Sequence, residues 1–271
     1  MHFRNIRVPA PQAQAAFVCP NPDAKEASPI GPSRPMKGRM MLATLRALTA
    51  ALALGAGAAS AATPDFSGVW MIEKPSNELR TSQGAMPPLN AQATEIYRQH
   101  RIQLQANDRS FDPTARCISP GLPRILTLPY PFKIFQDTRT ILFSFQWNRW
   151  FRYAELTGEK LDPPYPMSMG TARAHWDNNV LVIETEGLRA DNTLLDGTGM
   201  PHSESLGLTE RLKLVSKDTL EDRIMVSDPE TFTANWETVL RFKRQPRKTE
   251  ISEDVCYDRT DNGEPAVKPS S

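Results

Sequence analysis

The sequence predicts a mainly β domain, either an antiparallel β-barrel or a strongly curved sheet, with one helix near its start. Short segments of alternating apolar and polar residues follow one another between residues 139 and 243. Turn-forming residues separate these segments, and two of the connections have the composition of β-hairpins. Only residues 89–105 have the spacing of an amphipathic helix.

The N-terminal residues are expected to lie outside this domain. Residues 40–61 combine a basic start, an apolar run and small residues, which is typical of a secretory signal peptide cleaved near Ala61. We interpret residues 1–39 as a non-native or disordered extension, the alternative being a genuine cytoplasmic one. A single domain then covers residues 62–257, and a flexible polar tail covers 258–271. We therefore expect a periplasmic or secreted protein without a membrane span after cleavage.

The elements follow in order from residue 65. The first strand is expected at residues 65–73, and the helix at 89–105 begins with Asn90 as its cap. A turn-rich loop at Cys117 leads to a short segment at 132–136. The later strands are expected at residues 139–147, 150–156, 171–176, 180–186, 206–215, 220–226 and 236–243.

The hairpin around Asn178 indicates which side chains face outward. Asn tolerates the positive φ of a tight turn, so the flanking strands pair directly. Alternation then places Arg173 opposite Glu184 on the outer face, with His175 on the same face. We predict a solvated Arg173–Glu184 pair and interpret His175 as a surface residue rather than a ligand.

Composition excludes several classes of partner and cofactor. The 32 Lys/Arg and 31 Asp/Glu of the chain become 25 and 29 when residues 1–61, with 7 and 2, are set aside, giving a net charge of −4. This balance argues against a nucleic-acid surface and against attraction to an anionic membrane. Phosphate-binding glycine loops, dinucleotide motifs and zinc-ligand spacings do not occur, so we expect no cofactor and no metal.

Two of the three cysteines, Cys117 and Cys256, lie in the predicted domain. In an exported protein they are expected to form a disulfide that joins an early segment to the C-terminal end. The alternatives are two free thiols or catalysis by one of them. No histidine lies near either cysteine in the sequence, which favours the disulfide.

One acidic residue on an apolar strand face is the main indication of function. In residues 202–214 alternation places four leucines and Glu210 on one face, which also includes Glu204 and His202. A carboxylate on a buried face is costly unless it is paired, neutralised or used. A long polar loop brings Asp196 to the same end. These four residues are the predicted catalytic cluster, in which His202 shuttles a proton, Glu210 orients it or acts as base, and the others support them.

Each catalytic candidate also has a structural interpretation. His202 would bond a loop carbonyl, and Glu204 would pair at the rim. Glu210 would form a buried ion pair with an inward arginine such as Arg152, and we weigh this equally with catalysis. A serine hydrolase lacks specific support, because no Gly-x-Ser-x-Gly motif occurs.

Inward aromatic side chains suggest either a packed core or a ligand pocket. In a barrel that encloses a cavity they would line a pocket for an apolar or aromatic molecule. Arg152 would hold an anionic group of that molecule. The predicted substrate-binding residues are Arg152, Trp147, Trp150, Trp176 and Trp236.

Several motifs resemble an uncharacterised family of exported bacterial proteins. Its pattern, G-x-x-x-x-x-W…LVxxT…LDxxGxPHS…ER, is similar to the segments from Gly170 to Arg211, with Pro-His-Ser and Glu-Arg as the specific part. The likeness extends from Cys117 to Cys256, about half of the chain. The chain departs from the family at Thr171–Ala172, where the family has His-Ser, and at residues 177–179, where it has Glu-Gly-Asp. The resemblance implies export and a site near the Pro-His-Ser and Glu-Arg motifs, without a known activity.

Separately, Gly68-x-Trp70 on the first strand is similar to the opening motif of lipocalins, which implies a lipocalin-like barrel. We therefore expect a periplasmic, cofactor-independent enzyme of the lyase or isomerase type, acting by acid/base chemistry on a small organic, preferably aromatic, molecule. The alternative is a lipocalin-like periplasmic small-molecule-binding protein without catalysis, with Glu210 paired to one side of an apolar cavity. A third interpretation is a structural envelope protein without a cavity.

Overall fold

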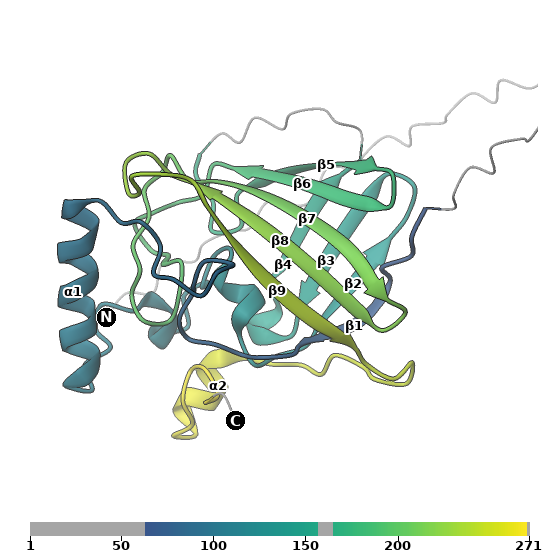
Figure 1. Ribbon diagram of the computed structural model, residues 1–271. Helices are drawn as coiled ribbons and strands as arrows, with labels where there is room; N and C mark the ends of the chain where they lie inside the picture. Colours follow the sequence, from purple (N-terminus) through teal and green to yellow (C-terminus); the bar gives the residue numbers. More distant parts are fainter. Residues whose placement is uncertain (1–62, 157–164, 270–271) are drawn as a thin grey trace, which may run out of the picture. The chain divides into compact units, whose positions relative to one another are not determined.

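Nine strands form a closed barrel in which each strand pairs with its neighbours in sequence and β9 returns to β1 (Figure 1). The computed structural model describes residues 63–156 and 165–269; the predicted extension and signal peptide lie outside them. The mainly β fold predicted from the sequence is thereby confirmed. The strands are β1 (Gly68–Ile72), β2 (Phe132–Gln136), β3 (Thr140–Phe145), β4 (Phe151–Glu155), β5 (Thr171–Asp177), β6 (Val180–Glu186), β7 (Gly207–Ser216), β8 (Thr219–Ser227) and β9 (Trp236–Arg244).

The β5–β6 hairpin forms as the sequence predicts. Asn178 adopts a φ of 55°, which a tight turn requires and asparagine tolerates. Arg173 pairs with Glu184 in the register, and its Nε donates to the Glu184 carboxylate at 2.7 Å. His175 is exposed on the same face. The predicted ion pair and the surface position of His175 are both confirmed.

One strand pair departs from antiparallel pairing and joins its two strands over only part of their length. The other eight pairs are antiparallel, but β4 and β5 are parallel and are joined only through Ala154–Ala172 and Glu155–Arg173. The chain that precedes β5 pairs on its other side instead, because the Met167 N–H donates to the Gly187 carbonyl at 2.9 Å. The first half of β4 is therefore left beside a gap, which we call the seam.

The helix α1 (Ala91–Gln105) lies outside the barrel wall (Figure 1). Asn90 caps it by accepting the Ala93 N–H at 2.9 Å, as the sequence predicts. Its Tyr97 hydroxyl lies 2.8 Å from the Thr198 hydroxyl, so the helix packs on the long loop between β6 and β7. Among the described residues, no helix has the length and apolar character to cross a membrane. The short 3₁₀ helices are η1 (Pro113–Arg116), η2 (Arg124–Thr127) and η3 (Trp147–Arg149).

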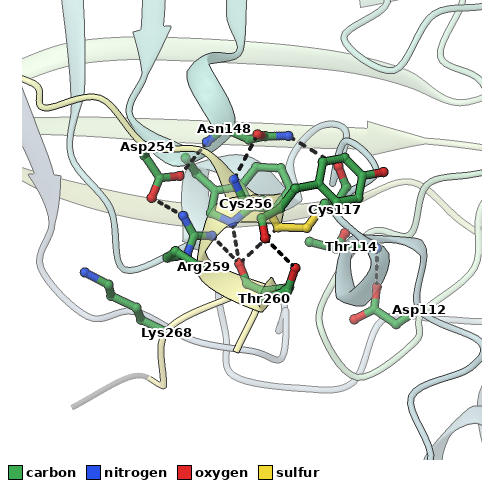
Figure 2. Close-up of a disulfide and its surroundings, with 12 residues drawn as sticks. Asp112, Thr114, Cys117, Asn148, Asp254, Cys256, Arg259, Thr260 and Lys268 are labelled. Atoms are coloured by element: carbon green, nitrogen blue, oxygen red, sulfur yellow. Dashed lines mark hydrogen bonds and ion pairs between the residues drawn. A yellow bond between two sulfur atoms is a disulfide. The ribbon is translucent and has the colours of Figure 1, made fainter. Parts of the chain in front are cut away.

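The predicted disulfide between Cys117 and Cys256 is confirmed and ties the C-terminal helix α2 (Cys256–Asp261) to the segment that precedes β2 (Figure 2). Asn148 reinforces this link from η3. Its side chain donates to the Cys117 carbonyl at 3.3 Å and accepts the Cys256 N–H at 3.2 Å. The bonded cysteines, Asn148 and Asp254 therefore form one connected unit, because Asp254 also accepts the Asn148 N–H at 2.7 Å.

The expectation of a flexible tail from residue 258 needs correction. Ala266 is buried, and its carbonyl accepts the indole N–H of Trp147 at 2.9 Å. The Lys268 N–H donates to the Tyr130 hydroxyl at 3.0 Å. The polar sequence did not predict that the C-terminal segment packs on the barrel, because this packing depends on two isolated contacts rather than on an apolar periodicity.

Candidate functional site

A buried ion pair crosses the barrel interior from β4 to β7. Arg152 and Glu210 both point inward, with side chains only 1% exposed. Nη1 of Arg152 donates to Oε1 of Glu210 at 2.9 Å, and Nη2 donates to Oε2. Nη2 also donates to the Thr185 hydroxyl on β6 at 2.5 Å. The structural interpretation of Glu210 as the partner of Arg152 is confirmed.

A second carboxyl group, Asp222 on β8, completes this cluster. Its register neighbour on β7 is Leu212, two residues beyond Glu210 on the same face. Burial raises the pKa of Asp222 well above its usual value, and the charge of Glu210 raises it further, while Arg152 opposes both. Burial and the charge of Glu210 therefore favour the protonated form of Asp222 in the folded protein. We call Arg152, Thr185, Glu210 and Asp222 the core ion cluster.

When Asp222 is protonated, the charge of Arg152 in the core ion cluster is matched by that of Glu210. The sequence carried the signal for Asp222, because it shares parity with the inward residues Leu220, Ile224 and Val226 on β8. The same reasoning that singled out Glu210 therefore applied to it. The expectation that Arg152 holds an anionic ligand needs correction, since both of its terminal nitrogens already serve Glu210.

His202 is buried, and both of its ring nitrogens contact neighbouring loop residues. Nδ1 lies 2.9 Å from the Ser203 carbonyl oxygen, and Nε2 lies 2.8 Å from the Thr193 hydroxyl. Burial lowers the pKa of His202, although the Ser203 carbonyl and the Asp228 carboxylate oppose this. Because a carbonyl oxygen can only accept, Nδ1 donates to Ser203, while the Thr193 hydroxyl itself donates to the Arg189 carbonyl. These contacts match the structural interpretation of His202, and they do not include the predicted partner Glu210.

Asp196 organises the loop between β6 and β7 rather than joining His202. Its carboxylate accepts the N–H groups of Leu79, Thr198 and Met200 at 3.0, 2.9 and 3.1 Å, and the Thr198 hydroxyl at 2.9 Å. Burial raises the pKa of Asp196 although these donors oppose it. The carboxyl group therefore fixes the backbone turn from inside, and the predicted four-residue cluster is not assembled.

The fourth candidate, Glu204, is exposed and lies at the rim of a cavity at the seam. This seam cavity has a volume of about 770 Å³ and separates the first half of β4 from the segment that leads into β5. Its lining consists of residues 150–153, residues 165–172, Arg189, Asp191 and Glu204.

The wall of the seam cavity is aromatic. Phe151, Tyr153 and Tyr165 are 57%, 53% and 65% exposed, and the rings of Phe151 and Tyr153 meet edge to face at 5.4 Å. Trp150 adds an indole to the same lining. Large aromatic side chains gathered at one opening are typical of a binding surface rather than of ordinary barrel exterior.

Three of the residues that line the cavity each carry a buried polar atom that has no hydrogen-bond partner within the described parts of the chain. These atoms are the indole Nε1 of Trp150, the guanidinium Nε of Arg152 and the hydroxyl of Thr171. Buried polar groups in folded proteins are nearly always satisfied. The concentration of three exceptions on one cavity marks it as the candidate functional site.

Only two of the predicted substrate-binding residues, Trp150 and Arg152, line this cavity. Trp147 is fully buried and bonded to Ala266, Trp176 packs on Phe66 at 5.4 Å, and Trp236 packs on Phe232 at 5.4 Å. The three indoles belong to the barrel core and its ends, because side chains fill the interior and the opening lies in the wall. Among residues 63–156 and 165–269, no group of His, Cys, Asp and Glu is arranged to hold a metal ion.

Comparisons with known proteins give likenesses among solved structures only. No family model and no curated protein matches the sequence. The chain is similar to a crystal structure of a mutant of the fluorescent protein UnaG, with 12% sequence identity and a TM-score of 0.33. The match covers 67% of this chain and 96% of that one. The likeness is too distant to indicate a function.

Proposed function

We propose that this protein is an exported small-molecule-binding protein whose binding site is the seam cavity. The observation that carries the proposal is an aromatic cavity of about 770 Å³, three of whose lining residues carry a buried, unpartnered polar atom. Ligand pockets commonly have volumes of about 300–1,000 Å³ and combine an apolar wall with a few polar groups. The seam cavity has this size and this composition.

The free energy of the unpartnered groups supports binding. A buried donor without an acceptor costs about 1–3 kcal/mol. A ligand that supplies acceptors to Trp150 and Arg152 recovers this cost on binding, which gives the site both affinity and orientation. The predicted catalytic residues give no comparable support for catalysis, because the polar atoms of His202 and Glu210 already bond Thr193, Ser203 and Arg152.

Export is part of the proposal and rests on the signal-peptide pattern at residues 40–61 and on the disulfide. Disulfides persist in oxidising compartments such as the periplasm. Expression of the full chain in a Gram-negative host, followed by fractionation and N-terminal sequencing, tests this. We expect a periplasmic product that begins near Ala62, and an uncleaved product in the cytoplasm would contradict export.

Binding is tested with two fluorescent probes of different charge, the neutral naphthyl ketone prodan and the anionic anilinonaphthalene sulfonate. We expect at least one to bind saturably at one site. Phe151→Ala removes a ring from the cavity wall and should weaken binding several-fold. Phe135→Ala is the matched control, because Phe135 is 45% exposed on β2 and does not line the cavity. Absence of saturable binding by both probes, or equal weakening by both substitutions, would refute the proposal.

A further inference from the structure

We infer that the seam cavity selects uncharged aromatic compounds that carry a carbonyl oxygen, and discriminates against the corresponding carboxylates. This inference rests on the proposed binding function and specifies its ligand class. It follows from the kind of polar groups on the lining and from the balance of charges around them.

The unpartnered nitrogen atoms demand a hydrogen-bond acceptor. Indole Nε1 of Trp150 and guanidinium Nε of Arg152 can only donate, whereas the Thr171 hydroxyl can donate or accept. Arg152 is 98% buried, so bulk water does not satisfy it. A ligand group that accepts from two N–H donors fits this lining, and a carbonyl oxygen, with two lone pairs, does so.

The charges favour a neutral acceptor over an anion. The positive charge of Arg152 is already matched by Glu210 through both terminal nitrogens. At the rim, Arg189 is matched by Asp191 through bonds of 2.7 and 2.8 Å. Glu204 adds a further acidic group to the same lining. A carboxylate ligand would lose its hydration without meeting an uncompensated cation, which is unfavourable.

The aromatic wall selects the body of the ligand. Trp150, Phe151, Tyr153 and Tyr165 line the cavity, and stacked or edge-to-face contacts favour a flat aromatic partner. The seam cavity therefore combines aromatic lining residues with two hydrogen-bond donors, at Trp150 and Arg152, whose surroundings carry no unmatched positive charge.

The test uses protein purified after expression of the full chain and three naphthalenes substituted at the same ring position: acetylnaphthalene, ethylnaphthalene and naphthoate. Binding of each is measured directly by calorimetry. We expect acetylnaphthalene to bind about five- to tenfold more tightly than ethylnaphthalene, the gain of one or two hydrogen bonds. Naphthoate should bind at least about tenfold more weakly than the ketone, because its charge is not compensated.

Substitutions identify the groups responsible. Trp150→Phe keeps a ring but removes the indole donor, so the preference for the ketone over the hydrocarbon should fall while the hydrocarbon still binds. Trp236→Phe is the matched control, since it removes another buried, unpartnered indole N–H that does not line the cavity. Glu210→Gln combined with Asp222→Asn leaves Arg152 without a counter-charge, and should shift the preference toward naphthoate.

The outcomes separate this inference from the proposed function. If none of the three compounds and neither fluorescent probe binds, both fail. If naphthoate binds the parent protein as tightly as the ketone, or if the ketone and hydrocarbon bind equally, the inference fails while binding stands. Circular dichroism establishes that each variant is folded; if the double variant is not, the comparison of Trp150→Phe with Trp236→Phe decides.

Discussion

Replacing the carboxyl group of Asp222 by an amide tests the electrostatics of the core ion cluster. Asp222→Asn keeps the shape of the protonated acid but removes its ability to ionise. Because burial and Glu210 raise the pKa of Asp222 in the folded protein, the folded state holds this proton at pH values where the unfolded chain has released it. The two side chains are therefore equivalent at low pH and differ as the pH rises.

The sign and size of the effect follow from proton linkage. The unfolded aspartate titrates near pH 4, so its contribution to stability is complete below about pH 4. It is lost as the pH rises toward the raised folded-state pKa, at up to about 1.4 kcal/mol per pH unit. Asparagine has no such loss. The free energy of unfolding of Asp222→Asn minus that of the parent should therefore increase with pH at up to this slope.

Urea denaturation of both proteins between about pH 4 and about pH 8 measures this difference. Asp218→Asn is the matched control, because it makes the same substitution at an exposed position in the turn between β7 and β8. A difference for Asp222→Asn that stays constant or falls with pH would show that Asp222 is ionised in the folded protein, and would refute the neutral-acid assignment.

Three further predictions concern the segments that position the seam. Replacing Cys117 and Cys256 by alanine should lower the free energy of unfolding by about 5 kcal/mol in the chain-entropy model, because the closed loop spans 139 residues. Urea denaturation of the variant and of the disulfide-bonded parent measures this loss, and an unchanged free energy of unfolding would contradict it. His202→Asn should make the stability of the fold less sensitive to acid. The buried neutral ring contributes stability above about pH 6.5, and this stability is lost as the pH falls toward the lowered pKa of His202. The melting temperature of the variant should therefore change less than that of the parent between pH 7 and about pH 5, and equal changes would contradict the prediction. Asp196→Ala leaves three buried N–H groups without their acceptor and should cost about 3 kcal/mol or more, whereas a loss below about 1 kcal/mol would show that the loop does not depend on it.

Alternation along the chain was sufficient to predict most of the barrel. Strands with one buried face carry a period of two, and a hairpin such as that at Asn178 fixes its own register locally. The parallel pairing of β4 with β5 was not accessible in this way. It depends on where the chain returns after residue 156, which is decided by contacts such as Met167 with Gly187 rather than by the strands themselves.

The candidate site was predicted only in part. Parity correctly marked Glu210 as an inward acid, and Arg152 was a named partner. The predicted catalytic residues His202, Glu210 and Asp196 bond other partners than one another, because parity does not reveal which neighbour a polar side chain contacts. The seam cavity was not predicted for a different reason: the segment from Tyr165 to Gly170 has no regular alternation, and its position depends on pairing with the residues that follow β6.

The most direct test of binding at the seam observes the indole N–H signals of the five tryptophans by ¹H–¹⁵N NMR during titration with acetylnaphthalene. Trp150→Phe assigns the Trp150 signal by its disappearance. We predict that this signal shifts saturably as the ligand accepts its hydrogen bond, while the Trp147 signal, whose N–H already donates to Ala266 at 2.9 Å, stays in place. A Trp150 signal that does not move while ligand binds, or a response confined to Trp147 or Trp236, would contradict a binding site at the seam.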